Sequence, residues 1–281
     1  MIETIRDLLT TARATVDTGS TMTSPKTLRL TVIQEAPRSR DLERNISRVS
    51  GAIAARDRSD LVVFPELFLS GYQTTALDEI ALTLDDPRIT GLSDCCRSAG
   101  TALLAGFVEQ GPGGYFDAYL AIDRDGTIRS SIRKTHLFGT EREAFLSGEV
   151  IEPVSLCDTK IGVLNCFELE FPEVARTLVL RGAALLVAGS ANMHPYERDH
   201  LIASSSRVLE NRVPLAYANR VGSESGHSFC GSSRIIDRDG SVVAALNSVE
   251  TGVVTVDLEV GLRSEGVVDM LGQRRPELYE S

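Results

Sequence analysis

Hydrophobic and polar positions alternate along the chain with two different periods. Between residues 28 and 258, short apolar runs or strict alternation predict strands, and apolar positions three or four residues apart predict helices. The predicted strands are 28–34, 61–64, 101–109, 116–122, 127–132, 154–157, 160–164, 185–188, 214–218, 228–236, 241–246 and 252–258. The predicted helices are 41–56, 87–99, 173–181 and 196–211. This mixture predicts an α/β fold with a mixed sheet, or with two sheets covered by helices.

The two ends of the chain differ from this core. Residues 1–27 combine one apolar side typical of a short helix with a linker-like stretch. We expect an N-terminal extension that is helical or partly disordered, although a subunit contact or a start at Met22 would also explain it. It lacks the apolar run of a secretory signal. The domain itself is predicted at 28–258, and 259–281 is a polar C-terminal tail, for which a subunit contact is one expectation.

Composition narrows the classes of partner. The 281 residues include 29 basic and 39 acidic ones, giving a formal charge of −10, which argues against nucleic acid or an anionic membrane as main partner. No apolar run approaches the roughly 18 to 20 residues of a membrane span. The five cysteines form neither a disulfide framework nor a CxxC pair, so a reducing cytoplasm is expected. The four histidines form no HxH or HExxH pattern, and neither a metal nor another cofactor is expected.

Three predicted strands end in residues suited to acyl transfer. The strand at 61–64 is followed by Pro65, which cannot continue a ladder, and then by Glu66. Two further strands lead to Lys134 and to Cys166. A thiol can attack a carbonyl carbon and a carboxylate can move protons, while an ammonium and a backbone N–H stabilise the oxyanion.

Cys166 stands where a strand gives way to the predicted helix 173–181. Unpaired N–H groups and the helix dipole favour an anion there, so the pKa of the thiol is expected to be lowered. A cysteine alone is more often a small buried hydrophobic residue, and a lone glutamate or lysine is more often a solvated charge. The joint occurrence of all three favours a nucleophile.

Longer stretches around these residues carry a resemblance to a known family. They are FPE at 64–66, RKTHLFGTEREAF at 133–145 and NCFELEFPE at 165–173, in that order. With them, residues 28–258 resemble the nitrilase, or carbon–nitrogen hydrolase, superfamily, and within it the aliphatic-amidase-like branch that includes 5-aminopentanamidase-type amidases. The resemblance implies a four-layer α-β-β-α sandwich of the nitrilase type. It also implies a homodimer or a higher homo-oligomer.

The resemblance further implies a mechanism. Cys166 would attack the carbonyl carbon of an amide, and Glu66 would act first as general base and then as general acid. Lys134 and the backbone N–H of Phe167 would hold the oxyanion. Ammonia would leave a thioester, which water would hydrolyse. A further family glutamate falls on Glu141, which is preferred to Glu143 by its position in the motif.

Candidate substrate contacts are less firmly indicated. They are Glu168, Glu170, Asn192, Met193 and His194. The family commonly has Cys-Tyr-Asp where this chain has Cys166-Phe167-Glu168, so the substrate or the rate is expected to be atypical. Glu168 and Glu170 could instead pair with Arg176 or cap the following helix.

A cationic ω-amino or guanidino amide is the favoured substrate, because Glu168, Glu170 or Glu141 could bind its cation. A ω-amidase, a deaminated-glutathione-type amidase, an N-carbamoyl hydrolase and a nitrilase stay open on the same residues. Two alternatives come from other classes: an acyltransferase that passes the thioester to an amine, and a non-catalytic binding protein with a degenerate pocket. The intact Glu66, Lys134 and Cys166 argue against the second.

Overall fold

A first six-stranded sheet forms one half of the computed structural model, which describes residues 26–55, 59–261 and 269–279. In spatial order its strands are β14 (Gly252–Val260), β1 (Lys26–Gln34), β2 (Leu61–Val63), β3 (Ala102–Gly111), β4 (Gly114–Ile122) and β5 (Ile128–Arg133). Strands β1, β2 and β3 run parallel, and the outer pairings are antiparallel.

A second six-stranded sheet repeats this plan. In spatial order its strands are β13 (Val242–Ala245), β12 (Arg234–Ile236), β9 (Leu215–Asn219), β8 (Leu185–Ser190), β7 (Thr159–Asn165) and β6 (Val154–Leu156). Here β7, β8 and β9 run parallel. A short hairpin, β10 (Val221–Glu224) and β11 (His227–Cys230), stands apart from both sheets.

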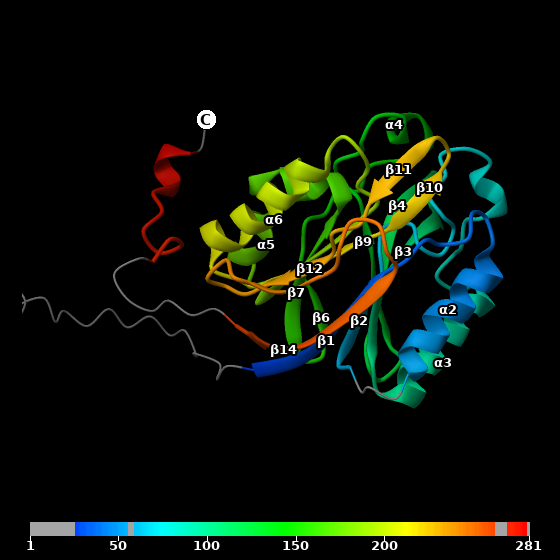
Figure 1. Cartoon of the computed structure of the whole chain (residues 1–281), viewed down its shortest axis with the longest axis horizontal. Coiled ribbons are helices and arrows are strands. Elements are labelled where there is room, and N and C mark those ends of the chain that lie inside the picture. The colour runs from blue at the N-terminus through cyan, green and yellow to red at the C-terminus, as the bar shows by residue number, and fades with distance from the viewer. Residues whose placement is uncertain (1–25, 56–58, 262–268, 280–281) are drawn as a thin grey trace, which may run out of the picture.

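Helices cover the outer face of each sheet. The helices are α2 (Leu42–Ala54), α3 (Pro87–Ala99), α4 (Glu141–Ala144), α5 (Pro172–Leu180) and α6 (Glu197–Asn211). Figure 1 shows α2 and α3 together on one side of the molecule and α5 and α6 on the other, with the sheets between. The four-layer α-β-β-α sandwich is therefore confirmed.

The period of two within single strands explains the layers. In β2, Leu61 and Val63 point into the apolar core between the sheets, whereas Val62 packs in a second core with residues of α2 and α3. A third core joins α5 and α6 to the second sheet. Caps fix where helices begin, as at α3, where the Asp86 side chain accepts the Arg88 N–H at 2.8 Å.

Two predicted elements differ from the structure. The stretch 228–236 is not one strand but β11 and β12, because Gly231 (φ +48°) and Ser232 (φ +61°) turn the chain between them. The helix expected after Cys166 is preceded by a short 3₁₀ turn, η2 (Cys166–Glu170). Most of the extension predicted at 1–27 lies outside the described residues; its last two residues belong to β1, and β14 runs to Val260.

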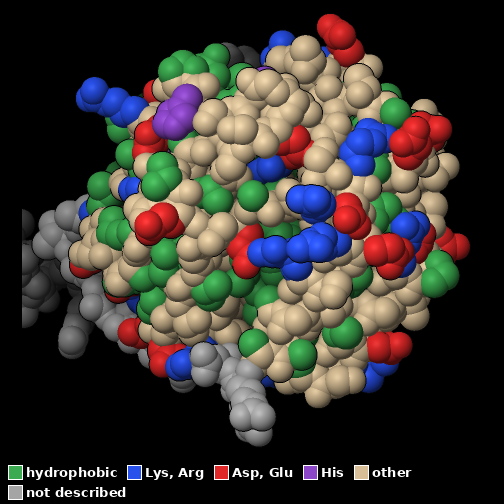
Figure 2. Space-filling model, turned by 45° about the vertical axis from the view of Figure 1, so that its right-hand side comes forward, with side chains coloured by type: hydrophobic (Ala, Val, Ile, Leu, Met, Phe, Trp, Pro, Cys, Tyr) green, Lys and Arg blue, Asp and Glu red, His purple; other side chains and the backbone are tan. Residues whose placement is uncertain are grey.

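The surface carries mixed charges. On the face drawn in Figure 2, basic and acidic side chains are interspersed and do not form a patch of one sign. Among the described residues, ion pairs such as Arg40 with Glu79 and Arg88 with Asp86 bring opposite charges together. Within the described ranges, no helix combines the length and apolar character needed to cross a membrane.

Candidate active site

Glu66 is held at the carboxyl end of β2 and is fully buried. Its Oε2 accepts the backbone N–H of Ala191, just beyond β8, at 2.8 Å, so the residue links the two sheets. The chain after Glu66 lies so close to β3 that a Cβ on Gly106 would meet the Leu67 nitrogen at 2.2 Å. Glycine at 106 is therefore required for this position of Glu66.

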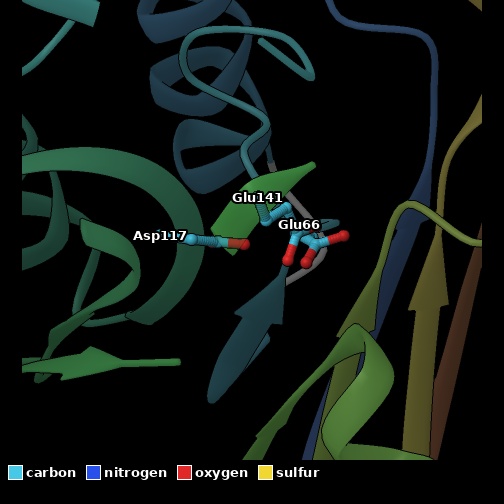
Figure 3. A group of neighbouring side chains, drawn as sticks. All are labelled: Glu66, Asp117 and Glu141. Atoms are coloured by element: carbon cyan, nitrogen blue, oxygen red, sulfur yellow. The ribbon is translucent and has the colours of Figure 1, made fainter. Parts of the chain in front are cut away.

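Lys134 lies at the end of β5 with its ammonium buried among three carboxylates. Nζ forms ion pairs with Glu66, with Asp117 Oδ2 at 3.2 Å and with Glu141 Oε2 at 2.9 Å. Figure 3 shows these three carboxylates, from separate elements, directed toward one another. Burial acts to lower the pKa of Lys134, but the carboxylates outweigh it and raise that pKa well above its ordinary value.

Glu141, at the start of α4, is the glutamate that reaches this cluster, and the competitor Glu143 is exposed. Its Oε1 accepts the hydroxyl of Tyr72 at 2.7 Å, and its Oε2 accepts the backbone N–H of Phe138 at 2.8 Å. Glu141 therefore joins Lys134, the Tyr72 hydroxyl and the main chain of Phe138.

Asp117 is a member of the cluster that the sequence analysis missed. It lies on β4 and is fully buried, and its Oδ1 accepts the side-chain amide of Asn165, the residue before Cys166, at 2.9 Å. Burial raises the pKa of Asp117 well above its usual range, against the lowering effect of Lys134. One signal was available, because a carboxylate inside an otherwise apolar strand is rarely buried without a partner.

The carboxylates of Glu66, Asp117 and Glu141 lie within 4.8 Å of one another, a spacing that could hold a metal ion. In this protein the Lys134 ammonium pairs with all three. The chain itself thus supplies the cation for these oxygens.

Cys166 directly follows β7 and adopts a left-handed conformation (φ +47°), which is strained for a residue other than glycine. Burial raises the pKa of its thiol well above the ordinary value; Glu66 raises it further, while Lys134 and a backbone hydrogen bond from Ala191 oppose the rise. The lowered pKa expected from the sequence is therefore wrong, because burial outweighs the effect of the short turn. The neighbouring N–H of Phe167 lies in the first turn of η2, where main-chain N–H groups have no intrahelical partner.

Two of the side chains proposed to contact substrate form hydrogen bonds within the protein. The Glu168 carboxylate is buried and accepts hydrogen bonds from Thr135 and Asn165. The Asn192 side chain accepts the Met193 N–H at 2.9 Å and donates to the Tyr196 carbonyl at 3.2 Å. Both side chains are held by hydrogen bonds within the loops of the site, and their direct role in binding substrate stays a prediction.

The other proposed contacts differ in exposure. Met193 is buried in an apolar cluster with Tyr72 and Phe229. His194 is exposed, and only its backbone is held, by the Ser228 carbonyl at 3.0 Å. Glu170 is about one-third exposed and lies 3.4 Å from His200 Nε2, so it retains a carboxylate surface that a ligand could reach.

Aromatic rings gather beside the nucleophile. The ring of Phe138 packs edge-on against Phe167 at 5.3 Å and against Tyr196 at 5.7 Å between centroids. Phe171 extends the group at 4.9 Å from Phe167. These rings come from the segments after Lys134, after Cys166 and after β8, and all are at least partly exposed.

A groove of about 1070 Å³ runs beside β5, and its lining includes Arg133, Leu146 and Gly148. Glu66, Lys134 and Cys166 are not part of that lining. The groove is therefore separate from the buried cluster.

Comparison with known proteins agrees with this geometry. The model of the carbon–nitrogen hydrolase family matches residues 29–265. A protein of Pseudomonas protegens described as "Hydrolase in pqqF 5'region" is 36% identical over 275 residues, covering 96% of each chain. An "(R)-stereoselective amidase" of Pseudomonas sp. is 32% identical over 252 residues, covering 88% of this chain and 92% of its own.

Among solved structures, a mutant of the amidase from Nesterenkonia sp. AN1 superposes with a TM-score of 0.79 at 28% identity, covering 90% of this chain and 95% of its own. It shows covalent addition of the acetamide moiety of fluoroacetamide at the active site cysteine. The chain therefore belongs to the carbon–nitrogen hydrolase family, in the amidase-like branch of the nitrilase superfamily, and is an enzyme of that class.

Proposed function

We propose that the protein hydrolyses a small linear amide to an acid and ammonia through a thioester on Cys166. The observation that carries this proposal is the buried ammonium of Lys134, which Glu66 and Glu141 hold at the strand ends where Cys166 also lies. An ammonium fixed by carboxylates in a buried site is suited to stabilise an oxyanion, because it needs no reorganisation during reaction.

Because the pKa of the Cys166 thiol is raised, the proposed mechanism needs a base, and Glu66 is that base. The resting nucleophile is a neutral thiol, so attack on the carbonyl carbon must be accompanied by transfer of the Sγ proton to Glu66. The oxyanion then lies against Lys134 and the Phe167 N–H. When the C–N bond breaks, Glu66 returns the proton to the leaving nitrogen and ammonia departs. Glu66 next takes a proton from water, which attacks the thioester and releases the acid and the thiol.

For the acyl group we propose a short chain with a cationic ω-amino or guanidino end. The carboxylates first considered for that cation are mostly engaged, since Glu141 binds Lys134 and Glu168 binds main-chain N–H groups. The support now comes from Glu170, which is partly exposed, and from the rings of Phe138 and Tyr196, whose faces attract cations. An ω-amidase or carbamoylase substrate would carry a carboxylate, which Glu170 would disfavour.

We also propose a homo-oligomer in a reducing cytoplasm. The support is the apolar surface left on α6, where Ile202 and Leu209 are about half exposed, together with cysteines that are all unpaired.

The test is intact-protein mass after brief incubation with matched short amides, for wild type and Cys166→Ala, with ammonia release measured in parallel. The panel contains two cationic amides, 5-aminopentanamide and 4-guanidinobutanamide, and hexanamide as their neutral control. It also contains glutaramate and a carbamoyl amino acid, which represent the ω-amidase and carbamoylase alternatives. We expect a Cys166-dependent acyl adduct, with turnover of the cationic amides at least about tenfold above hexanamide, as one partly desolvated cation contact would give. Equal ammonia release by Cys166→Ala would refute the thioester route. An adduct that an added amine consumes without release of acid would indicate an acyltransferase.

A further inference from the structure

Glu168 joins the two main-chain segments that carry the ammonium and the thiol. Its Oε1 accepts the Thr135 N–H at 2.7 Å and the Thr135 hydroxyl at 2.6 Å. Its Oε2 accepts the Asn165 N–H at 2.7 Å. Thr135 directly follows Lys134, and Asn165 directly precedes Cys166. One side chain therefore connects the first sheet's last strand to the turn of the nucleophile.

The burial of this carboxylate needs a reason. Glu168 is 4% exposed, and no basic side chain in the described ranges forms an ion pair with it. A buried carboxylate without a counter-ion is costly unless hydrogen bonds compensate it. Here three donors do so, and two of them are main-chain N–H groups, of which that of Asn165 is buried and that of Thr135 is partly buried.

The same contacts act on the strained turn. Cys166 holds φ at +47°, a conformation that persists only where surrounding contacts enforce it. The bond from Asn165 N–H to the side chain three residues later closes a ring around Cys166. The bonds to Thr135 tie that ring to the segment of Lys134.

We propose that Glu168 is a positioning residue, which sets the separation of the Cys166 thiol and the Lys134 ammonium so that the oxyanion forms against Nζ. It contacts neither substrate nor reacting atoms. This inference rests on the roles proposed above for Cys166 and Lys134. It also explains why a longer glutamate stands beside the nucleophile: its two oxygens reach both segments at once.

The test compares Glu168→Gln, Glu168→Asp and Thr135→Val in steady-state kinetics and in the single-turnover rate of acyl-adduct formation. Glutamine has one accepting oxygen and a donating amide, so one of the two main-chain N–H groups loses its acceptor. We expect kcat and the acylation rate to fall by about 100-fold in Glu168→Gln with KM within about threefold, the size of a misplacement of about 1 Å. Glu168→Asp keeps the charge and should recover part of that loss.

Thr135→Val removes the hydroxyl, which contacts Glu168 and also His136 Nδ1, and it leaves the main-chain contacts in place, so it is a milder variant than Glu168→Gln. We expect kcat to fall about three- to tenfold, as loss of one charge-assisted hydrogen bond would give. An unchanged kcat in this folded variant would contradict the proposal.

Asp123→Asn is the matched control. Asp123 is also a buried carboxylate that joins two turns, through the Cys157 N–H at 2.9 Å and the Arg124 N–H at 2.9 Å, but at the other end of β7. We expect it to lower the melting temperature and to leave kcat within about twofold, as for a substitution remote from the site. The proposal is overturned if Glu168→Gln keeps wild-type kcat, or if Asp123→Asn loses as much kcat at equal loss of stability. Full activity of Cys166→Ala would instead refute the proposed function.

Discussion

The two ends of β7 each carry a cysteine in the same unusual backbone conformation. Cys157 precedes the strand with φ +51°, and Cys166 follows it with φ +47°. Burial raises the pKa of both thiols, that of Cys157 to about 12. Backbone strain therefore does not distinguish the nucleophile from its counterpart, and burial acts on the pKa of both thiols in the same direction, although Cys157 is fully buried and Cys166 is partly exposed.

The difference lies in what surrounds each sulfur. Cys157 donates to the Asp60 carbonyl at 3.1 Å, and the pKa of its thiol is also raised by Asp123, a buried carboxylate that is paired with Arg129. Cys166 shares the Ala191 N–H with Glu66, and Lys134 lies close enough to act on its pKa. Both cysteines therefore have a buried carboxylate nearby, but only Cys166 also has a buried ammonium, because the cations that act on Cys157, Lys26 and Arg124, are partly exposed.

The largest effect is expected from exchanging the two thiols for alanine in turn. Cys166→Ala should lower kcat by about 10⁴-fold or more, as loss of a nucleophile does elsewhere. Cys157→Ala should keep kcat within about twofold and lose only about 1 kcal/mol of stability. Ammonia release and thermal unfolding measure the two quantities. Comparable losses of activity would remove the distinction drawn between the ends of β7.

The next effect concerns two basic side chains, Lys134 in the buried cluster and Arg129 beside Asp123. Lys134→Met should lower kcat by about 10³-fold, because an oxyanion contact is lost. It should also destabilise the protein by about 3–5 kcal/mol, because the buried carboxylates lose their counter-ion. Arg129→Met, which removes the half-exposed partner of Asp123, should leave kcat unchanged. Chemical denaturation and initial rates test both, and a stable Lys134→Met would contradict the charge balance described here.

A smaller effect tests how tightly Glu66 is placed. Gly106→Ala puts a Cβ 2.2 Å from the Leu67 nitrogen, so the segment of Glu66 must move. We expect kcat to fall about 100-fold. Gly51→Ala on α2 meets nothing within 4 Å and is the control, expected to keep kcat and to gain about 0.5–1 kcal/mol. Wild-type rates for both would show that Glu66 tolerates displacement.

The smallest effect compares two aspartates, Asp117 within β4 and Asp123 directly after this strand. The pKa of Asp117 is raised by burial, whereas hydrogen bonds to Asp123 outweigh its burial and lower its pKa. Unfolding lets Asp117 ionise above about pH 4, so its burial costs stability at pH 7, and Asp117→Asn should raise the unfolding free energy there. Asp123→Asn should lower it by about 1–3 kcal/mol, an effect that fades as pH falls through the low pKa of the native carboxyl. Denaturation at pH 3, 4 and 7 measures the signs, and equal signs at pH 7 would contradict the assignment.

The residues that follow the predicted strands were the part of the sequence that best predicted the site. The layers follow from apolar periodicity. Glu66 and Lys134 come together because β2 and β5 end at the same edge of the first sheet, and Glu141 lies on α4, shortly after β5. Asp117 was missed although it interrupts an apolar strand, because its partners Lys134 and Asn165 are far from it in the sequence. The contacts of Glu168 could not be read from the sequence for the same reason, because its partners Thr135 and Asn165 are far apart in the chain. The direction of the Cys166 pKa depends on burial, which residue order alone does not give.

The raised pKa of the Cys166 thiol affects how fast the enzyme should lose activity by oxidation. Peroxides oxidise the thiolate, and sulfenic acid forms fastest on exposed cysteines of low pKa. Burial raises the pKa of the Cys166 thiol, and in the mechanism proposed above the thiol gives its proton to Glu66 as it attacks the carbonyl carbon. Its activity should therefore outlast that of hydrolases whose nucleophile is stored as an anion when both are kept in air.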